Sequence, residues 1–590
     1  PSLTPSNVQY QYAGLYMSTH DMSVDEIRAM VQAHYQSAAH LREAGYDGVM
    51  LLASHAGILE TFVSPYFNNR TDGYGGSLEN RLRFALECCN AAREGAGDGM
   101  AVGMRFNCDE LISGGYDTTE AREIVEAICS SGLIDFVDFD VALEPQELEL
   151  GMPPVFIEPH VYKPYVEAVR CAAKGVAVLS VLGRTTSVAE AEAAIASGVC
   201  DMVGAARALI AEPELVKNAY EGNEERSRTC IACNWCLEGL SRGSAGCAIN
   251  PASYRERMWG VDTFTPASRR SRVIVVGGGP GGMEAARVSA LRGHDVTLVE
   301  ARDNLGGALA LWANLPGRDW FWKGIEWWKR ELDRLSVTVH LGTEATAESV
   351  LAEKPDAVIV ATGALYSRGG RSGFLSRDIP GHERDFVYRP EDILLKGVRP
   401  LGKVLLLDGE GLHTSVGIAE VLASAGADVE YMTPGFSPVS HSLVFNAEWE
   451  LVLQRLRAVG VTFTPATYVK SIREHEVLVY DVFNKEERAV FGVDAVVLST
   501  GRVPQNAIAK ALEGRIDQLY SIGDALSARP LAAAAYEGQQ FARYIGDSHA
   551  PKTVAEAYFR SNPPETWSKP AEVLLGSTGD RIWTRRTVRS

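Results

Sequence analysis

Four cysteines near the middle of the chain have the spacing of a redox-cofactor ligand set. They are Cys230, Cys233, Cys236 and Cys247, with two, two and ten residues between them. A cubane iron–sulfur cluster needs one thiolate for each iron corner, which suits three cysteines in one short loop with a fourth nearby. A structural zinc usually takes two separated pairs of ligands, and four unrelated thiols are a further alternative. The spacing favours a 4Fe–4S cluster.

A glycine-rich turn further along the chain is typical of a dinucleotide site. Gly277, Gly279 and Gly282 follow the hydrophobic run 273–276 and open a predicted helix. Such glycines allow a tight turn and the close approach of a pyrophosphate to the helix N-terminus. Glu300 ends the next predicted strand, about 20 residues on, where a carboxylate holds a ribose hydroxyl. We predict an adenine nucleotide here, and the sequence leaves FAD and bare ADP open.

A second glycine turn lies inside this nucleotide module. Gly409-Glu410-Gly411 follows the hydrophobic run 403–407, and Thr414 stands where a third glycine would allow close helix–strand packing. The Glu410 carboxylate would also repel a pyrophosphate. We therefore expect a degenerate NAD(P)-binding unit, and the sequence does not decide whether NAD(P)H is used.

Length, charge and cysteine content limit the class of protein. At 590 residues the chain is long enough for three or four domains. Its formal net charge of −18 argues against nucleic acid and against an anionic membrane, and no apolar run approaches the roughly 20 residues of a membrane span. We expect a cytoplasmic protein, because no disulfide framework is apparent. Six further cysteines are expected in the core, namely Cys88, Cys89, Cys108, Cys129, Cys171 and Cys200.

Strands and helices alternate regularly over the first part of the chain. Strand-like runs lie at 46–53, 101–106, 134–139, 176–181 and 201–204, and helical patterns lie at 23–44, 77–94, 118–131, 161–173 and 187–197. Such alternation indicates a parallel sheet, and its end on two phosphate-type loops indicates a (β/α)8 TIM barrel. Since eight strands close a barrel and we count five, we expect about three strands before Pro1, in a longer protein or on a separate polypeptide.

Candidate chemistry gathers at the carboxyl ends of these strands, where barrels place their active sites. The residues there are His55, Arg105, Asn107, Gly183, Arg184, Gly204 and Arg207. The last four form two loops that each place a glycine amide and a guanidinium before a helix, which is typical of a phosphate site. The alternative for each arginine is a surface ion pair.

The stretch 62–81, FVSPYFNNRTDGYGGSLENR, together with the four-cysteine loop and the domain behind it, resembles the old yellow enzyme class fused to an electron-transfer module. Trimethylamine dehydrogenase and 2,4-dienoyl-CoA reductase belong to this group, and the resemblance covers about residues 1–545. It implies that FMN lies in the barrel, with Arg105 at its ring and His55 beside the substrate. It also implies that the FMN phosphate is held by Gly183, Arg184, Gly204 and Arg207. In the second module, five residues match the nucleotide-binding motifs of flavoprotein reductases, namely Arg302, Gly307, Thr362, Gly363 and Asp524.

Four positions depart from the family pattern. Gly57 stands two residues after His55, where the family usually has a proton-donating tyrosine. Leu52, Ser187 and Leu240 replace a tyrosine, an aspartate and a tryptophan of trimethylamine dehydrogenase. Trimethylamine is therefore not the expected substrate.

Five segments follow from these patterns. They are an FMN-binding barrel portion (1–225), a cluster loop with linker (226–271), an adenine-nucleotide domain (272–390 and 495–548), an inserted NAD(P)-binding-like domain (391–494) and a C-terminal arm (549–590). We expect a homo-oligomer that acts on a small molecule, without nucleic-acid or membrane partners.

Two directions of electron flow are compatible with this machinery. In the first, an amine or N-methyl compound reduces FMN, and the cluster passes electrons to an electron-transfer flavoprotein. In the second, NAD(P)H reduces the flavin and an activated alkene is reduced, which needs an acid such as His55. A third possibility is an inactive redox scaffold, against which the retained His55 and Arg105 argue. Gly57 and the degenerate second turn favour amine oxidation, with His55 as the catalytic residue.

Overall fold

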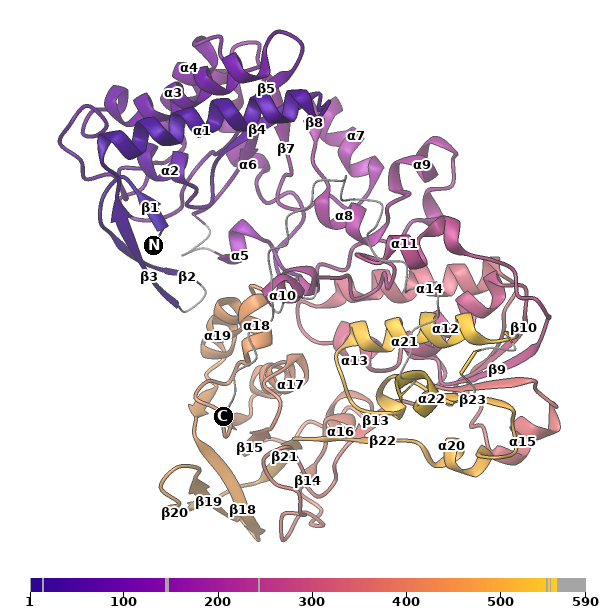
Figure 1. Ribbon diagram of the computed structural model, residues 1–590. Helices are drawn as coiled ribbons and strands as arrows, with labels where there is room; N and C mark the ends of the chain where they lie inside the picture. The colour runs from indigo at the N-terminus through magenta and orange to yellow at the C-terminus, as the bar shows by residue number, and fades with distance from the viewer. Residues whose placement is uncertain are drawn as a thin grey trace, which may run out of the picture.

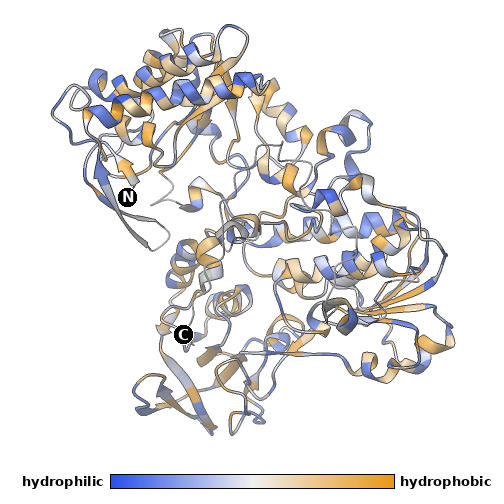
Figure 2. Cartoon of the chain, viewed as in Figure 1, coloured by the Kyte–Doolittle hydropathy of each residue, from blue (hydrophilic) through white to orange (hydrophobic). Residues whose placement is uncertain are grey.

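Three five-stranded parallel sheets organise the computed structural model, one in each of the three parts visible in Figure 1. The structure describes residues 2–12, 15–143, 148–241, 243, 245–547, 550–551 and 553–559. Hydrophobic residues gather along the strands of the sheets, and many hydrophilic residues lie along the outer helices (Figure 2). Among the described residues, no helix combines the length and apolar character needed to cross a membrane.

The first sheet carries the five strands expected for the barrel portion, in chain order. They are β4 (Gly48–Ala53), β5 (Ala101–Asn107), β6 (Phe136–Asp140), β7 (Ala177–Ser180) and β8 (Met202–Val203). The helices between them are α2 (Ile58–Val63), α3 (Leu78–Ala96), α4 (Thr118–Ser130), α5 (Leu148–Gly151), α6 (Lys163–Arg170) and α7 (Val188–Ala196), with α1 (Val24–Glu43) before β4. In the described residues the sheet is open, with β4 and β8 at its edges.

Side-chain caps explain where several of these helices begin. Ser23 and Ser187 each form a capping box, with Glu26 and Glu190, and Asp117 accepts from the first amides of α4. Such caps satisfy N–H groups that have no partner inside the helix. Ser187, which stands where trimethylamine dehydrogenase has an aspartate, therefore serves as a helix cap here.

The N-terminal residues form strands that the sequence analysis did not assign. β1 (Ser2–Thr4), β2 (Gln9–Tyr12) and β3 (Leu15–Asp21) make a small sheet of order β1-β3-β2. Thr19 joins it to the preceding loop by hydrogen bonds with the backbone of Val8. The polar character of this stretch hid the strands, because strand patterns are read mainly from apolar alternation.

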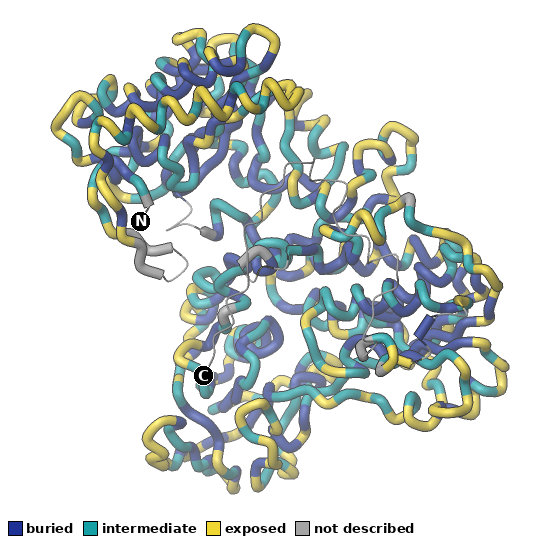
Figure 3. Tube along the Cα trace, viewed as in Figure 1, coloured by how far each residue is buried: buried dark blue, intermediate teal, exposed yellow. Residues whose placement is uncertain are grey.

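The second sheet has the order β11-β10-β9-β12-β23. Its strands are β9 (Arg272–Val276), β10 (Asp295–Val299), β11 (Thr338–His340), β12 (Ala357–Val360) and β23 (Gln518–Ser521), and α12 (Pro280–Leu291) packs against α21 (Leu531–Tyr544). Further elements of this module are α13 (Gly307–Ala313), α14 (Trp322–Arg334), α15 (Ala347–Ala352), α20 (Ala507–Leu512), β13 (Ala364–Tyr366), β22 (Arg502–Pro504) and α22 (Val554–Phe559). β12 is buried along its whole length. Buried stretches lie inside each part of the molecule and exposed stretches lie on the outer loops (Figure 3).

The third sheet is inserted in the second module and has the order β14-β21-β15-β16-β17. Its strands are β14 (Val387–Tyr388), β15 (Lys403–Asp408), β16 (Asp428–Met432), β17 (Thr462–Thr464) and β21 (Ala495–Ser499). Its helices are α16 (Pro390–Leu394), α17 (His413–Ser424), α18 (His441–Phe445) and α19 (Trp449–Ala458), and an antiparallel sheet of β18 (Thr467–Arg473), β19 (Glu476–Asp481) and β20 (Glu487–Phe491) extends from it. We call this insertion the nested unit.

The segment that joins the barrel portion to the second module lies at the centre of the molecule. It contains α10 (Trp235–Ser241) and α11 (Glu256–Trp259), and α10 lies where the three parts meet (Figure 1). α8 (Ala206–Ala211) and α9 (Leu215–Tyr220) precede it and end the barrel portion. The segment 226–271, expected to be a cluster loop with linker, thus includes two α-helices among its described residues. Two further expectations need correction: Cys171 is exposed, and the helix expected over 161–173 ends at Arg170 and continues as a 3-10 turn. The end of the arm, 571–590, lies outside the described residues.

Candidate flavin and nucleotide sites

His55, Arg105 and Asp140 meet at the carboxyl end of the barrel sheet. Nε2 of His55 lies 2.7 Å from Oδ2 of Asp140, and Nε of Arg105 donates to the same oxygen at 2.8 Å. Asp138, two residues earlier on β6, lies 3.2 Å from Nη1 of Arg105. Because parallel strands end at one edge of a sheet, side chains that follow β4, end β5 and end β6 converge there.

These contacts keep Asp140 ionised despite its burial. Burial alone would raise the pKa of Asp140, but the hydrogen bond and charge of His55 and the charge of Arg105 bring it below its usual value. Asp138 has fewer such contacts, and burial raises its pKa to about 6. The site therefore has one carboxylate that is firmly charged and one that titrates near neutrality.

The chain makes a sharp turn directly after β4. His55 and Ala56 both have left-handed backbone angles, with φ of 55° and 56°, which are uncommon for residues other than glycine. Gly57 follows as the N-cap of α2, and a Cβ on it would lie 2.9 Å from the carbonyl oxygen of Ser54. A tyrosine therefore does not fit at position 57 without a backbone shift.

Two buried carboxyl groups lie next to this turn, and one of them, Glu60, accepts a hydrogen bond from it. Glu60 is fully buried and accepts hydrogen bonds from the Ala56 amide and from Nδ2 of Asn107. Burial, with the charge of nearby Glu110, raises the pKa of Glu60 well above its usual value. Glu110 itself accepts from Ser64 and from the Tyr116 amide, and burial raises its pKa to about 7.

The two predicted phosphate arginines lie close together without a carboxylate partner among the described residues. Arg184 is buried and donates to the carbonyls of Pro154 and Ile157, while its Nε finds no acceptor among the described residues. Arg207 donates to the carbonyl of Gly183 at 2.8 Å. Burial and the charge of Arg207 lower the pKa of Arg184 to about 10.

These features fit the phosphate of FMN. Two unneutralised guanidiniums repel each other until an anion lies between or beside them. A Cβ at Gly183 would lie 2.9 Å from Val161, and one at Gly204 would lie 2.8 Å from Val181, so both positions need glycine. Burial of Arg184 argues against its alternative assignment as a surface ion pair.

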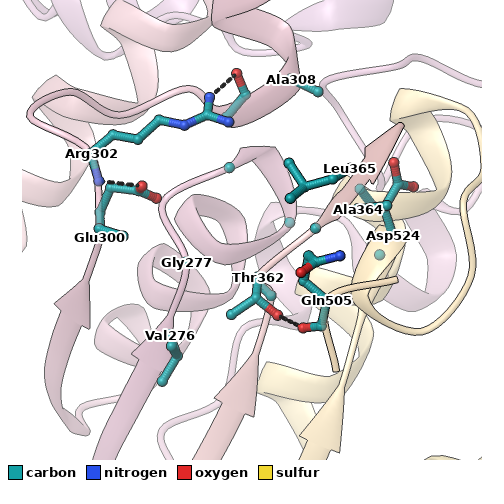
Figure 4. A pocket seen from close by; sticks show the side chains of 18 of the residues that line it. Val276, Gly277, Glu300, Arg302, Ala308, Thr362, Ala364, Leu365, Gln505 and Asp524 are labelled. Carbon is teal, nitrogen blue, oxygen red and sulfur yellow. Dashed lines mark hydrogen bonds between the residues drawn. The ribbon is translucent and has the colours of Figure 1, made fainter. Parts of the chain in front are cut away.

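A cavity of about 640 Å³ lies over the first glycine turn (Figure 4). The predicted residues that line it are Gly277, Gly279, Glu300, Arg302, Gly307, Thr362, Gly363 and Asp524. Glu300 accepts from the amides of Gly278 (2.6 Å) and Arg302 (2.8 Å), so the carboxylate braces the turn. Gly282 lies behind the cavity, where a Cβ would be 1.9 Å from the Gly277 carbonyl oxygen. These residues fit an adenine nucleotide.

The second glycine turn is bound by the protein's own carboxylates. Asp408 accepts from the amides of Glu410 and Gly411 and from the hydroxyl of Ser415. Glu410 is paired with Nε of Arg502 at 2.9 Å, and Arg502 also binds Asp524 of the adenine-nucleotide site. The amides that would bind a pyrophosphate thus donate within the chain.

The four cysteines are partly buried and lie near one another, with Cys236 in α10. Burial raises the pKa of Cys247 to about 12, and nearby Cys230 adds to this effect. Burial likewise raises the pKa of Cys233, with contributions from the three other thiols. A metal must displace these protons to bind. In the described part of the chain, no three ligand groups are close enough to hold a metal ion, and the cluster stays a prediction resting on a donor set of four sulfurs.

Comparison with known proteins gives the chain a family. Residues 2–226 match the NADH:flavin oxidoreductase / NADH oxidase family, and residues 271–524 match the pyridine nucleotide-disulphide oxidoreductases. A probable N-methylproline demethylase of Rhizobium meliloti is 32% identical, over 89% of this chain and 80% of that protein. The chain belongs to the old yellow enzyme-type FMN oxidoreductases with a C-terminal pyridine nucleotide-disulphide oxidoreductase domain.

Other members of this flavin oxidoreductase family extend the comparison. An N,N-dimethylglycine/sarcosine dehydrogenase of Chromohalobacter salexigens is 32% identical, over 91% of this chain and 78% of that protein. Histamine dehydrogenase from Rhizobium sp. 4-9 has a similar structure, with a TM-score of 0.86, 31% identity and coverage of 92% of this chain and 80% of that one. The resemblance to the family is thus confirmed, and the chain is a flavin oxidoreductase.

Sequence reasoning did not identify three residues of these sites. Asp140 directly follows the predicted strand 134–139 and ends β6, so its place at a strand end is the signal that could have identified it. Asp408 directly precedes the second glycine turn, so the sequence could have predicted its contact with the amides of that turn. Asn234 lies between two cysteines, and nothing in the sequence indicates that it binds Arg207.

Proposed function

We propose that this flavin oxidoreductase oxidises an amine at a carbon next to nitrogen, as an amine dehydrogenase or N-demethylase. The observation that carries the proposal is the second glycine turn, whose amides donate to Asp408 and whose Glu410 is tied to Arg502. A turn held in this way does not favour a nicotinamide cofactor as the source of electrons. We therefore expect electrons to come from the organic substrate.

The names of two relatives narrow the substrate class. N-methylproline demethylase and N,N-dimethylglycine/sarcosine dehydrogenase are named for amino acids that carry N-methyl groups. We propose secondary and tertiary N-methyl amines, N-methyl amino acids first among them, as substrates. Position 57 supports oxidation over alkene reduction, because the tyrosine that donates a proton elsewhere in the family does not fit there.

The residues at the strand ends supply the proton chemistry. An ammonium substrate must lose a proton before a hydride can leave the neighbouring carbon. Nδ1 of His55, opposite the ring nitrogen that contacts Asp140, accepts this proton, and the Asp140 carboxylate stabilises the imidazolium that forms. Hydride loss leaves an iminium, water adds to it with release of a proton, and the C–N bond then breaks to give an aldehyde and an amine with one methyl group fewer.

Arg105 and the phosphate arginines would hold the flavin next to that carbon. Arg105 is fixed at one oxygen of Asp140, and Arg184 and Arg207 would bind the phosphate. When bound, FMN supplies the two-electron acceptor, and a 4Fe–4S cluster on Cys230, Cys233, Cys236 and Cys247 supplies a one-electron path out. We propose an electron-transfer flavoprotein as the final acceptor.

Anaerobic mixing of the purified protein tests the direction of electron flow. One set of mixtures contains NADH or NADPH, and the other contains a panel of N-methyl amines and N-methyl amino acids. We expect bleaching of the flavin absorbance with an amine and none with a nicotinamide. Bleaching by NADH or NADPH alone would contradict the proposal.

The alternative function is an NAD(P)H-dependent enoate reductase. A relative from Caballeronia cordobensis, 30% identical over 95% of this chain and 81% of that protein, is named a multifunctional alkene reductase/demethylase. In that case His55 would donate the proton that an alkene reduction needs. Bleaching by a nicotinamide followed by reoxidation with an activated alkene would favour this function.

A further inference from the structure

The side chain of Asn234 makes hydrogen bonds to three separate parts of the chain. Its Oδ1 accepts from Nη1 of Arg207 at 2.6 Å, and its Nδ2 donates to the carbonyls of Met152 at 2.9 Å and Asn446 at 3.0 Å. The residue is 2% exposed. Both N–H groups and the carbonyl oxygen of the amide are therefore in use.

The three partners come from elements that are far apart in sequence. Arg207 lies in α8 and Met152 follows α5, both in the barrel portion, whereas Asn446 directly follows α18 of the nested unit. α10 begins after Asn234 and lies between these parts (Figure 1). A second hydrogen bond lies nearby and joins the two helices themselves, from Ser442 on α18 to Glu238 on α10 at 2.7 Å.

Asn234 also fixes the backbone of the four-cysteine loop. It lies between Cys233 and Cys236, and its φ of 50° is left-handed, a conformation that asparagine adopts more readily than most residues. Ala232, before Cys233, has a φ of 55°. Two left-handed residues therefore flank Cys233, and the Asn234 side chain ties this part of the loop to Arg207.

We infer that Asn234 is a positioning residue that holds the four-cysteine loop against the FMN phosphate site through Arg207. The inference rests on the proposed FMN and cluster. Electron transfer between two cofactors slows steeply as their separation grows, so a loop that moves away from Arg207 would slow it. The same contact orients the Arg207 guanidinium, which also donates to the Gly183 carbonyl. Loss of Asn234 should therefore affect both cofactor sites.

Two substitutions and a matched control test this role. Asn234→Ala removes all three hydrogen bonds, and Asn234→Asp keeps an acceptor for Arg207 but loses both donors and adds a negative charge. Ser442→Ala removes the hydrogen bond to Glu238 at the same helix contact and leaves Arg207 untouched. Thermal unfolding shows whether each variant folds, and iron content shows whether it still holds the cluster.

The first readout is FMN affinity, measured by fluorescence titration of protein stripped of flavin. We expect Asn234→Ala to bind FMN about tenfold more weakly, as the loss of one hydrogen bond to a charged group implies. Asn234→Asp should bind still more weakly, because its carboxylate neutralises Arg207 and repels the phosphate. Ser442→Ala should match the parent protein.

The second readout is electron transfer without substrate. Light-driven reduction of the flavin is followed by rapid freezing, and electron paramagnetic resonance reports the reduced cluster. Both Asn234 variants should transfer electrons about tenfold more slowly or worse, as misplacement of a reacting group implies. Parent-like values in both readouts for Asn234→Ala, or equal losses in Ser442→Ala, would overturn the inference.

This design separates the inference from the proposed amine oxidation. No amine is needed in either readout, so an absence of amine-driven bleaching would contradict the proposed function and leave the role of Asn234 intact. A parent protein that contains neither iron nor sulfide after anaerobic reconstitution would overturn the cluster and this inference together.

Discussion

Oδ2 of Asp140 lies 2.7 Å from Nε2 of His55 and accepts a second hydrogen bond, at 2.8 Å, from Nε of Arg105. One carboxylate oxygen on β6 therefore orients side chains that belong to the ends of two other strands. Because a carboxylate that holds an imidazole also fixes which ring nitrogen carries the proton, Asp140 decides where His55 can accept one.

Asp140→Asn should slow flavin reduction by an amine roughly hundredfold, because the amide cannot stabilise an imidazolium. Stopped-flow absorbance under anaerobic conditions measures this rate. Asp138→Asn is the matched control, since Asp138 contacts Arg105 at 3.2 Å on the same strand. Equal rates in the two variants would remove Asp140 from the mechanism.

His55→Ala should also slow flavin reduction by substrate and leave FMN bound, because the phosphate arginines lie elsewhere, Arg184 after β7 and Arg207 in α8. FMN content by absorbance and the reduction rate are measured on the same sample. The double variant with Asp140→Asn should be about as slow as His55→Ala alone, since residues that act as a unit are not additive. Additive losses would show that the two residues act separately.

The four-cysteine loop should contain about four irons and four sulfides per chain after anaerobic reconstitution. Cys233→Ala or Cys247→Ala should abolish most of this content, because a cubane needs all four thiolates. Cys171→Ala, at an exposed cysteine outside the loop, is the control and should retain it. One zinc per chain with no sulfide would contradict the assignment.

Glu300→Ala should release the adenine nucleotide and spare FMN. The carboxylate braces the turn through the amides of Gly278 and Arg302, and loss of such charged hydrogen bonds weakens binding about tenfold or more. Chromatography of the nucleotides released by heat gives both contents and also distinguishes FAD from ADP. Asp303→Ala, on the exposed part of the same loop, should keep its nucleotide.

Glu110 should make stability depend on pH. Its folded-state pKa of about 7 is above the ordinary value of 4.5, so its contribution is fully present below about pH 4.5 and is lost as the pH rises through 7. Glu110→Gln should therefore raise the free energy of unfolding at pH 8.5, relative to its effect at pH 5, by up to about 3 kcal/mol. Thermal unfolding at both pH values measures this, with exposed Glu123→Gln as control. A constant difference between Glu110→Gln and the parent would show that Glu110 keeps its ordinary pKa.

The main features of the fold were predictable because their signals are local. The alternation of apolar runs with amphipathic stretches predicted β4 to β8 in order, and the glycine turn before α12 predicted a nucleotide-binding sheet. The strands before α1 were missed because their sequence is largely polar and lacks a clear apolar alternation. Cys171 was misplaced because an apolar neighbourhood in sequence does not decide which side of a helix end meets solvent.

The sequence by itself determined the family, the chemical types at the strand ends and the spacing of the cysteines, since these depend on residues that are near one another in the chain. Tertiary structure alone decided that Asp140 joins His55 to Arg105 and that Asn234 joins Arg207 to the nested unit. Asp140 is 85 residues from His55, and Asn234 is 212 residues from Asn446. Contacts over such separations depend on how strand ends and helices pack, and local sequence patterns do not predict that packing.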